Sequence, residues 1–417
     1  MNMVKLGVDP FLDPTDRFLA EIAFSIQLPP SLHKKAVERY EAVRKHLEAS
    51  VTFANQIEHF YPQGSMAIDA TISTRGTDSE YDIDIIAQLG SRFHNKQPLD
   101  VLLELEKALQ GYQGLKVIRQ TRCVTLDYGD SMHLDVSSTR RRAGTPDRWS
   151  DLMHAKGPQR SPDDHLVATD AYGFAQWYIE RTPVETRVVE AFRHRWQDAM
   201  KYRADADADD VPEQTIFVVK NMATLALQLV KRYRNISHEK ANRTGRMPPS
   251  VMLACYAARS VILGLTLTEA LINLCNTIIR DIELASRLGR LLHVVNPTFN
   301  EDVFTDRWPE NIIQQNVFAA ELGQLVTAIE RIRSAKADPA DIPNILRSLF
   351  GDRVVTAAVR KVAMEGGSAV KNATQSYTKA GRLILPTSVA ATPALAAPKT
   401  LSSVAATSHR FYGDVVE

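Results

Sequence analysis

Apolar positions recur at helical spacing near both ends of the main fold and with a strand-like period of two in between. They predict helices from Asp13 to about Ile26 and from about Leu32 to Ala49. Strands and an amphipathic helix over 100–110 follow, and long helical stretches return over 250–290 and 309–334. This order predicts an α+β fold, with a mixed-sheet lobe followed by a mainly α-helical lobe.

The predicted strand Glu80 to Ile86 alternates acidic and apolar side chains. Asp82 and Asp84 therefore point to one face of the strand, while Ile83 and Ile85 point to the other and anchor it in a core. Two carboxylates this close repel, and a divalent cation commonly keeps both ionised. Such oxygen ligands suit Mg²⁺ or Mn²⁺. Taken alone, Asp-x-Asp is more often a solvated edge strand without function.

The turn Gln63-Gly64-Ser65 and a third carboxylate favour a metal site over a solvated edge strand. Gly64 lets the backbone approach a phosphate, Ser65 adds a hydroxyl donor, and residues 66–70 can begin a helix whose N-terminus attracts anions. Residues 122–128 and 132–136 predict a hairpin whose second strand carries Asp135. The pattern predicts a phosphate-binding turn beside two metal-binding carboxylates on one strand and a third on its neighbour.

These motifs resemble the DNA polymerase β-type nucleotidyltransferases, and in particular the bacterial cGAS/DncV-like nucleotidyltransferases, or CD-NTases. Three further segments resemble the narrower group: Ala168–Tyr178, Val230–Arg234, and Asn296–Asp302 with Trp308. The resemblance covers about residues 14–335. The sixteen residues between Ser65 and Asp82 suit the longer cGAS-like pattern.

The resemblance implies a polymerase β-like catalytic lobe and an OAS/cGAS-like helical lobe. It assigns catalysis and two Mg²⁺ or Mn²⁺ ions to Asp82, Asp84 and Asp135, and nucleotide binding to the turn at 63–65. It also assigns contact with the donor triphosphate to Lys231, with Lys220 as a less favoured substitute. The implied product is a cyclic di- or trinucleotide second messenger made from NTPs, ATP included, in anti-phage (CBASS) signalling.

Two other functions stay open from the residues alone. The acidic cluster does not reveal the acceptor, so template-independent addition of nucleotides to RNA or protein is an alternative. A catalytically inactive nucleotide-binding scaffold is another. The 50 basic and 49 acidic side chains give a net charge of +1, which argues mildly against an RNA substrate. Nucleic acid is therefore not a required partner.

Basic residues stand out at two further places. Those at 139–162 predict a solvated loop, with phosphate binding as the functional alternative. Lys231, Arg232 and Arg234 end a helix predicted from Glu213, where cations also complement the helix dipole.

The predicted domains are the N-terminal helices and catalytic lobe (1–165), a helical lobe (166–365) and a flexible tail (366–417). The tail ends in the aromatic run 408–417, a candidate recognition segment for a CBASS accessory protein.

The sequence favours a cytoplasmic protein without a membrane contact. Its N-terminus lacks an apolar signal core, and the apolar run 251–267 is interrupted by Arg259, which indicates a core helix. Cys123, Cys255 and Cys275 have no paired spacing and are expected to be free thiols.

Overall fold

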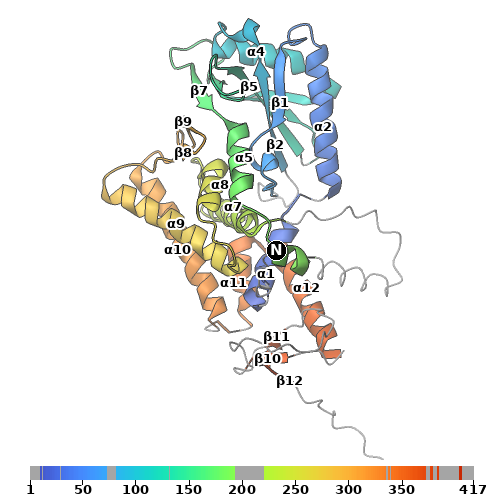
Figure 1. Ribbon diagram of the computed structural model, residues 1–417, viewed down its shortest axis with the longest axis vertical. Coiled ribbons are helices and arrows are strands. Elements are labelled where there is room, and N and C mark those ends of the chain that lie inside the picture. The colour runs from blue at the N-terminus through green and yellow to red at the C-terminus, as the bar shows by residue number, and fades with distance from the viewer. Residues whose placement is uncertain are drawn as a thin grey trace, which may run out of the picture.

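Seven strands of the first lobe form one mixed sheet in the computed structural model (Figure 1). The strands are β1 (Ile57–Pro62), β2 (Tyr81–Leu89), β3 (Lys116–Arg119), β4 (Val124–Asp127), β5 (Met132–Arg141), β6 (Ser150–His154) and β7 (His165–Thr169). Their order is β1-β2-β5-β4-β3, and β6 joins β5 to β7. Strands β2 and β5 run parallel, and the other pairs run antiparallel.

The structure describes a defined set of residues. These are 10–11, 13–28, 30–72, 81–130, 132–192, 220–334, 337–338, 340–371, 376–378, 383–384 and 403–405.

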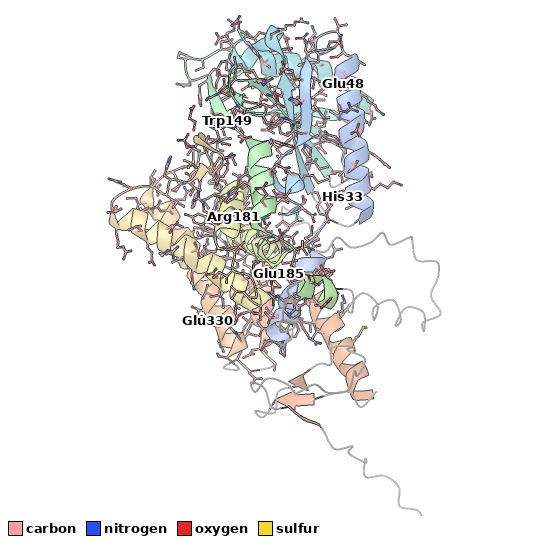
Figure 2. All side chains as sticks on the ribbon, in the orientation of Figure 1. His33, Glu48, Trp149, Arg181, Glu185 and Glu330 are labelled. Carbon is pink, nitrogen blue, oxygen red and sulfur yellow. The ribbon has the colours of Figure 1, made fainter. Side chains whose placement is uncertain are left out.

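Helices α2 (Pro30–Ala49) and α4 (Pro98–Leu109) supply apolar residues to the core of the sheet lobe. Leu47 and Leu105 are fully buried there with Ile83 and Ile85 of β2. The odd-numbered positions of β2 thus face this core, as the alternation along the strand predicts. Figure 2 shows α2 along the outer side of the lobe, between the labelled His33 and Glu48.

The second lobe is helical and has a core of its own. Its helices are α5 (Ala171–Arg181), α7 (Met222–Lys240), α8 (Ser250–Arg259), α9 (Leu267–Arg287), α10 (Ile312–Arg333), α11 (Ile342–Phe350) and α12 (Asp352–Lys371). Strands β8 (Val295–Asn296) and β9 (Phe299–Val303) form a hairpin between α9 and α10. Helix α5 leads from the sheet into this lobe (Figure 1).

The first helix, α1 (Pro14–Ser25), packs in the helical lobe. Its N-cap is Asp13, whose side chain accepts a hydrogen bond from the backbone N–H of Thr15 at 2.7 Å. Leu19 and Ile22 lie in the helical core, and Lys361 of α12 contacts the carboxylate of Glu21 at 2.7 Å. Helix α1 therefore belongs to the lobe that the later helices complete.

The predicted α+β fold with a mixed-sheet lobe and a helical lobe is confirmed. The division at residues 165 and 365 stays a prediction, and position 365 falls inside α12. The described part of the tail forms three short strands in one sheet: β10 (Ser376–Thr378), β11 (Leu383–Ile384) and β12 (Ser403–Ala405). The candidate recognition segment 408–417 lies outside the described residues.

The apolar run 251–267 differs from the single core helix that we expected. Helix α8 ends at Arg259, and the loop after it leaves Ile262 and Leu263 more than half exposed, at 57% and 59%. Every helix within the described ranges is too short or too polar to span a bilayer. All three cysteines are free, and Cys255 and Cys275 are buried.

Candidate active site

The three predicted carboxylates lie on one face of the sheet. In the parallel register of β2 and β5, Asp84 lies opposite Asp135, and Asp82 lies opposite His133. Because side chains alternate along each strand, Asp82, Asp84 and Asp135 share the face opposite the core that buries Ile83. The structure therefore brings together acids that are about fifty residues apart in the sequence.

Burial and repulsion from the neighbouring carboxylates perturb the pKa of Asp84 strongly. Burial, followed by the charges of Asp135 and Asp82, raises the pKa of Asp84 to about 7, while the nearby Lys231 acts in the opposite direction. Asp135 is held from its other side, because the hydroxyl of Thr125 donates a hydrogen bond to its Oδ1 at 2.5 Å. Burial and the charge of Asp135 also raise the pKa of the Cys123 thiol.

These acids fit a divalent cation by their chemistry. Three carboxylates on one face supply hard oxygen donors, and their repulsion is the kind that a bound cation relieves. Among the described residues, no three His, Cys, Asp or Glu side chains already converge as a formed metal site.

The turn before β2 passes very close to Asp84. Gly64 has φ +59°, and a Cβ atom at that position lies only 2.7 Å from Oδ2 of Asp84. The backbone N–H of Gln63 donates to the carbonyl of Asp84 at 2.8 Å, and the Gln63 amide reaches the Ser137 hydroxyl at 3.4 Å. Glycine is required at position 64 for both its conformation and its contact.

The helix that we expected over 66–70 is a single turn, α3 (Gly64–Ala67). After it, the N–H of Ala70 donates to the carbonyl of Ser65 at 2.8 Å, and Asp69 adopts a left-handed conformation with φ +53°. The segment closes on itself as a compact turn. It therefore presents Ser65 from a single helical turn and not from the end of a long helix.

Lys231 reaches this turn from the helical lobe. Its ammonium donates to the Ser65 hydroxyl at 2.7 Å and to the Ala70 carbonyl at 2.8 Å. Burial, followed by the charge of Arg234, lowers the pKa of Lys231 to about 7, against the opposing effect of Asp84 and Asp82. The cation is thus held beside the acidic face.

The position of Lys231 in its helix corrects one expectation. Helix α7 continues to Lys240, so Lys231, Arg232 and Arg234 lie in the middle of the helix, where the dipole explanation does not apply. Arg232 donates to the Phe350 carbonyl at 2.9 Å, and Arg234 donates to the Pro248 carbonyl at 2.6 Å. These two arginines are structural, whereas Lys231 points to the turn.

The basic segment 139–162 is a loop only in part. Strand β5 runs to Arg141 and β6 spans Ser150–His154, so the expected continuous loop is divided into 142–149 and 155–162. Arg142 contacts Asp151 and Glu301, both at 2.7 Å, so it joins β5 to the hairpin of the helical lobe. The guanidinium of Arg148 lies over two aromatic rings, 4.9 Å from the centroid of Tyr61 and 4.4 Å from that of Tyr172.

A second junction between the lobes lies at the segment 296–302, which includes β9. Trp149, labelled in Figure 2, stacks on Phe299 of β9 with ring centroids 4.1 Å apart. Asp302 of β9 accepts hydrogen bonds from the backbone N–H of Asp170 at 3.0 Å and from the Asn296 amide at 2.9 Å. The sequence carried no signal for this pairing beyond the family resemblance. The hydrogen bond between Asp302 and the N–H of Asp170 fixes the point where β7 leads into α5.

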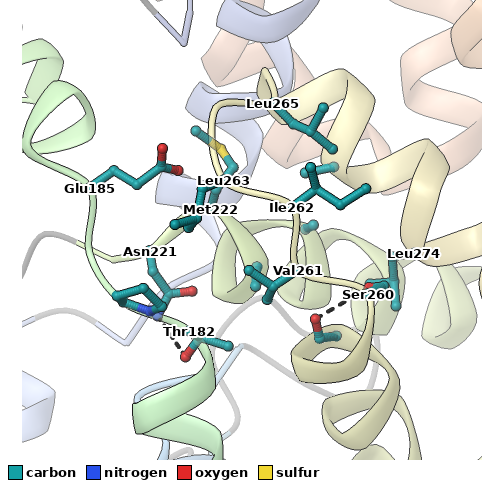
Figure 3. Close-up of a pocket in the computed structure, with 15 residues that line it drawn as sticks. Thr182, Glu185, Asn221, Met222, Ser260, Val261, Ile262, Leu263, Leu265 and Leu274 are labelled. Carbon is teal, nitrogen blue, oxygen red and sulfur yellow. Dashed lines mark hydrogen bonds between the residues drawn. The ribbon is translucent and has the colours of Figure 1, made fainter. Parts of the chain in front are cut away.

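A pocket between α5, α7 and the loop after α8 does not coincide with the acidic face (Figure 3). Its lining is mainly apolar, with Met222, Ile262 and Leu265 among its residues, and contains none of the predicted site residues. The Asn221 amide donates to the Thr182 hydroxyl at one side of it, at 3.3 Å. The carboxylate face, and not this pocket, carries groups suited to phosphoryl chemistry.

Comparison with known proteins agrees with this geometry. Residues 15–180 match the family model of the Second Messenger Oligonucleotide or Dinucleotide Synthetase domain. The chain is 45% identical over 408 residues to the cyclic dinucleotide synthase CdnG of Bradyrhizobium diazoefficiens, covering 97% of this chain and 96% of the relative.

Solved structures give the same fold. The structure of the B. diazoefficiens CD-NTase CdnG in complex with GTP matches with a TM-score of 0.74 and 44% identity, over 85% of this chain and all (100%) of that one. The E. coli MS115-1 CdnC:HORMA-deltaN complex matches in fold alone, with a TM-score of 0.53 and 16% identity over 82% of this chain and 98% of that one.

The predicted resemblance is thereby confirmed. The carboxylates on β2 and β5, the turn at Ser65 and the helical lobe belong to one catalytic fold. This chain is a member of the CD-NTase family of cGAS/DncV-like nucleotidyltransferases, the enzymes that synthesise oligonucleotide second messengers.

Proposed function

We propose that this enzyme joins two NTPs, one of them GTP, into a cyclic dinucleotide. The observation that carries the proposal is the register of β2 and β5, which sets Asp84 opposite Asp135 with Asp82 on the same face. One relative supports the substrate and the ring size: CdnG of B. diazoefficiens is named a cyclic dinucleotide synthase, and its solved structure is a complex with GTP. Of the di- and trinucleotide products expected from the sequence, we therefore favour the dinucleotide.

In this proposal, Asp82 and Asp84 hold two Mg²⁺ or Mn²⁺ ions, and Asp135 completes the site nearest the acceptor hydroxyl. Bound cations of this kind lower the pKa of an attacking hydroxyl and neutralise charge on departing pyrophosphate. In this proposal Asp135, which accepts a hydrogen bond from Thr125 at its Oδ1, also accepts the proton of the attacking 3′- or 2′-hydroxyl.

The turn and Lys231 bind the triphosphate of the donor nucleotide. Gly64 allows the backbone to approach a phosphate, and the Ser65 hydroxyl lies beside it as a donor. Lys231 already contacts Ser65 at 2.7 Å and adds positive charge on the same side. Lys220 is a poorer candidate for this role, because its ammonium is paired with Asp69.

Family membership favours a nucleotide acceptor over the RNA, protein and inactive-scaffold alternatives, and the net charge of +1 agrees. The role in anti-phage signalling stays a prediction.

A protein partner at the tail also remains a proposal, supported by the complex of the distant relative CdnC with HORMA-deltaN. Truncation after Lys371 keeps α12 whole and should abolish binding of such a partner, and unchanged binding would contradict this proposal.

Pyrophosphate release from NTPs with Mg²⁺ tests the catalytic assignment. Asp82→Ala should abolish release while circular dichroism and the unfolding midpoint show an intact fold. Asp127 offers a matched control, because it lies on neighbouring β4 and its carboxylate accepts from the N–H of Gly129 at 2.9 Å. Asp127→Ala should retain activity. Full activity in Asp82→Ala, or equal loss in both variants, would overturn the assignment.

A further inference from the structure

Three side chains on and just before helix α7 donate to three successive carbonyls of the turn after Ser65. Lys220 donates to the carbonyl of Asp69 at 2.7 Å, Lys231 to that of Ala70 at 2.8 Å, and Gln228 to that of Thr71 at 3.1 Å. The donors come from the helical lobe, and the acceptors follow the turn that carries Ser65. We call these three contacts the carbonyl clamp.

Gln228 is the clamp residue farthest from nucleotide chemistry. It is fully buried, at 0% exposure, and its amide is satisfied on both sides. Its Nε2 donates to Thr71, and its Oε1 accepts from the Gln27 amide at 3.2 Å. Gln27 itself forms a β-bridge with Ile72. The Gln228 amide thus ties the turn both to α7 and to the segment that follows α1.

The clamp holds a segment whose conformation is unfavourable alone. Asp69 lies at φ +53°, in the left-handed region that is unfavourable for residues other than glycine. Lys220 contacts both the carbonyl and the carboxylate of this residue. At the next residue, the N–H of Ala70 donates to the carbonyl of Ser65 at 2.8 Å, so the clamped segment is directly bonded to the proposed phosphate-binding residue.

We propose that Gln228 and Lys220 are positioning residues that fix the Ser65 turn against Asp84 for triphosphate binding. The inference rests on the proposed function of that turn. Neither residue needs to touch the nucleotide, because each acts through a main-chain carbonyl of the turn. The turn packs tightly against Asp84, because a Cβ atom added at Gly64 would lie only 2.7 Å from Oδ2 of Asp84. A small displacement of the turn therefore changes its position relative to the acidic face. Displacing a binding group by about 1 Å can reduce a reaction rate by about 100-fold.

The test compares two buried glutamines. Gln228→Leu removes the donor to Thr71, and Gln315→Leu is the matched control. Gln315 is also 0% exposed and bonded to three groups, but it joins α9 to α10: it donates to Ser286 and to the Arg290 carbonyl and accepts from Leu292. The readouts are the unfolding midpoint, KM and kcat for pyrophosphate release, and the Kd of a non-hydrolysable GTP analogue.

We expect both variants to lose a similar amount of thermal stability. Only Gln228→Leu should raise KM and the Kd of the analogue, each by about 10-fold or more, with a smaller fall in kcat. Values within twofold of the wild type, or equal changes in Gln315→Leu, would overturn the inference. If the wild type releases no pyrophosphate, the proposed function fails, while the analogue Kd still tests the clamp.

Substitution of Lys220 gives a second test, which can be used even if Gln228→Leu does not fold. Lys220→Met removes a donor to the clamped turn, and Lys240→Met removes a similar donor from the end of α7, where the ammonium contacts the Ser348 carbonyl at 2.7 Å. Weaker binding of the analogue in Lys220→Met alone supports the clamp. Unchanged binding in both variants contradicts it.

Discussion

The ammonium of Lys231 on α7 donates a hydrogen bond to the Ser65 hydroxyl at 2.7 Å, across the junction of the two lobes. This contact places the buried cation of the helical lobe beside the acidic face of the sheet. The proposed catalytic site is therefore built by both lobes. Substitutions on either side of the contact should affect nucleotide binding.

Lys231→Met removes that cation while keeping much of its volume. Because the charge and both hydrogen bonds are lost, we expect kcat/KM to fall by about 100-fold. The unfolding midpoint should change little, since burial already lowers the pKa of Lys231 to about 7 and thus opposes its charge. Steady-state pyrophosphate release and calorimetry measure the two effects. A kcat/KM within twofold of the wild type would exclude a role in triphosphate binding.

Asp84→Asn separates metal binding from folding. Burial and the neighbouring carboxylates raise the pKa of Asp84 from 3.8 to about 7, so without a cation the folded protein loses stability as the pH rises from about 4 to about 7. At pH 8 without divalent ions, the variant should be more stable than the wild type by up to about 4 kcal/mol. Added Mg²⁺ with GTP should raise the unfolding midpoint of the wild type and leave that of the variant unchanged. Equal stabilisation of both would argue against this metal ligand.

Gly64→Ala tests the close approach of the turn to β2. The new methyl group meets Oδ2 of Asp84 at 2.7 Å, so we expect about a 100-fold loss of activity. Gly111→Ala is the control, because Gly111 also has a positive φ, +76°, but nothing lies within 4 Å of its Cβ position. Both variants should lose about 1 kcal/mol of stability from backbone strain. Comparable activity losses would mean that strain, and not the contact, is responsible.

Asp302 should make the stability of the lobe junction depend on pH. Burial raises its pKa from 3.8 to about 6, although the Asp170 N–H and Asn296 oppose the shift. This carboxyl therefore contributes stability that is present below about pH 4 and lost as the pH rises through about 6.

Asp302→Asn should remove that dependence. From pH 4 to 7, the free energy of unfolding of the variant should rise relative to the wild type by up to about 3 kcal/mol, at about 1.4 kcal/mol per pH unit between 3.8 and about 6. Urea unfolding across this range measures the difference. A constant difference between the two proteins would show that Asp302 does not titrate in it.

The local parts of the site were predictable from the sequence. The period of two along β2 places Asp82 and Asp84 on one face, and the hairpin of β4 and β5 brings in Asp135. Helices α1 and α2 begin and end close to where capping residues and apolar spacing put them. Each of these features is determined by residues close together in the sequence. The local pattern of apolar and polar residues is therefore enough to predict it.

Contacts between distant segments were not predictable in the same way. Gln228 and Thr71 are 157 positions apart, and no periodicity signals a side chain that donates to a far carbonyl. Phosphate binding was the alternative interpretation of the basic residues at 139–162. The pairing of β5 with β6 instead places Asp151 beside Arg140 and Arg142. Packing of α1 in the helical lobe likewise depends on the tertiary arrangement alone.

Product analysis tests the central claim most directly. The purified protein is incubated with all four labelled NTPs and Mg²⁺ or Mn²⁺, treated with phosphatase, and its products are resolved by chromatography and mass spectrometry. We predict a phosphatase-resistant cyclic dinucleotide containing guanine, which Asp82→Ala does not make. A product that phosphatase degrades, or one made equally by Asp82→Ala, would contradict the assignment of this chain as a cyclic dinucleotide synthase acting through these carboxylates.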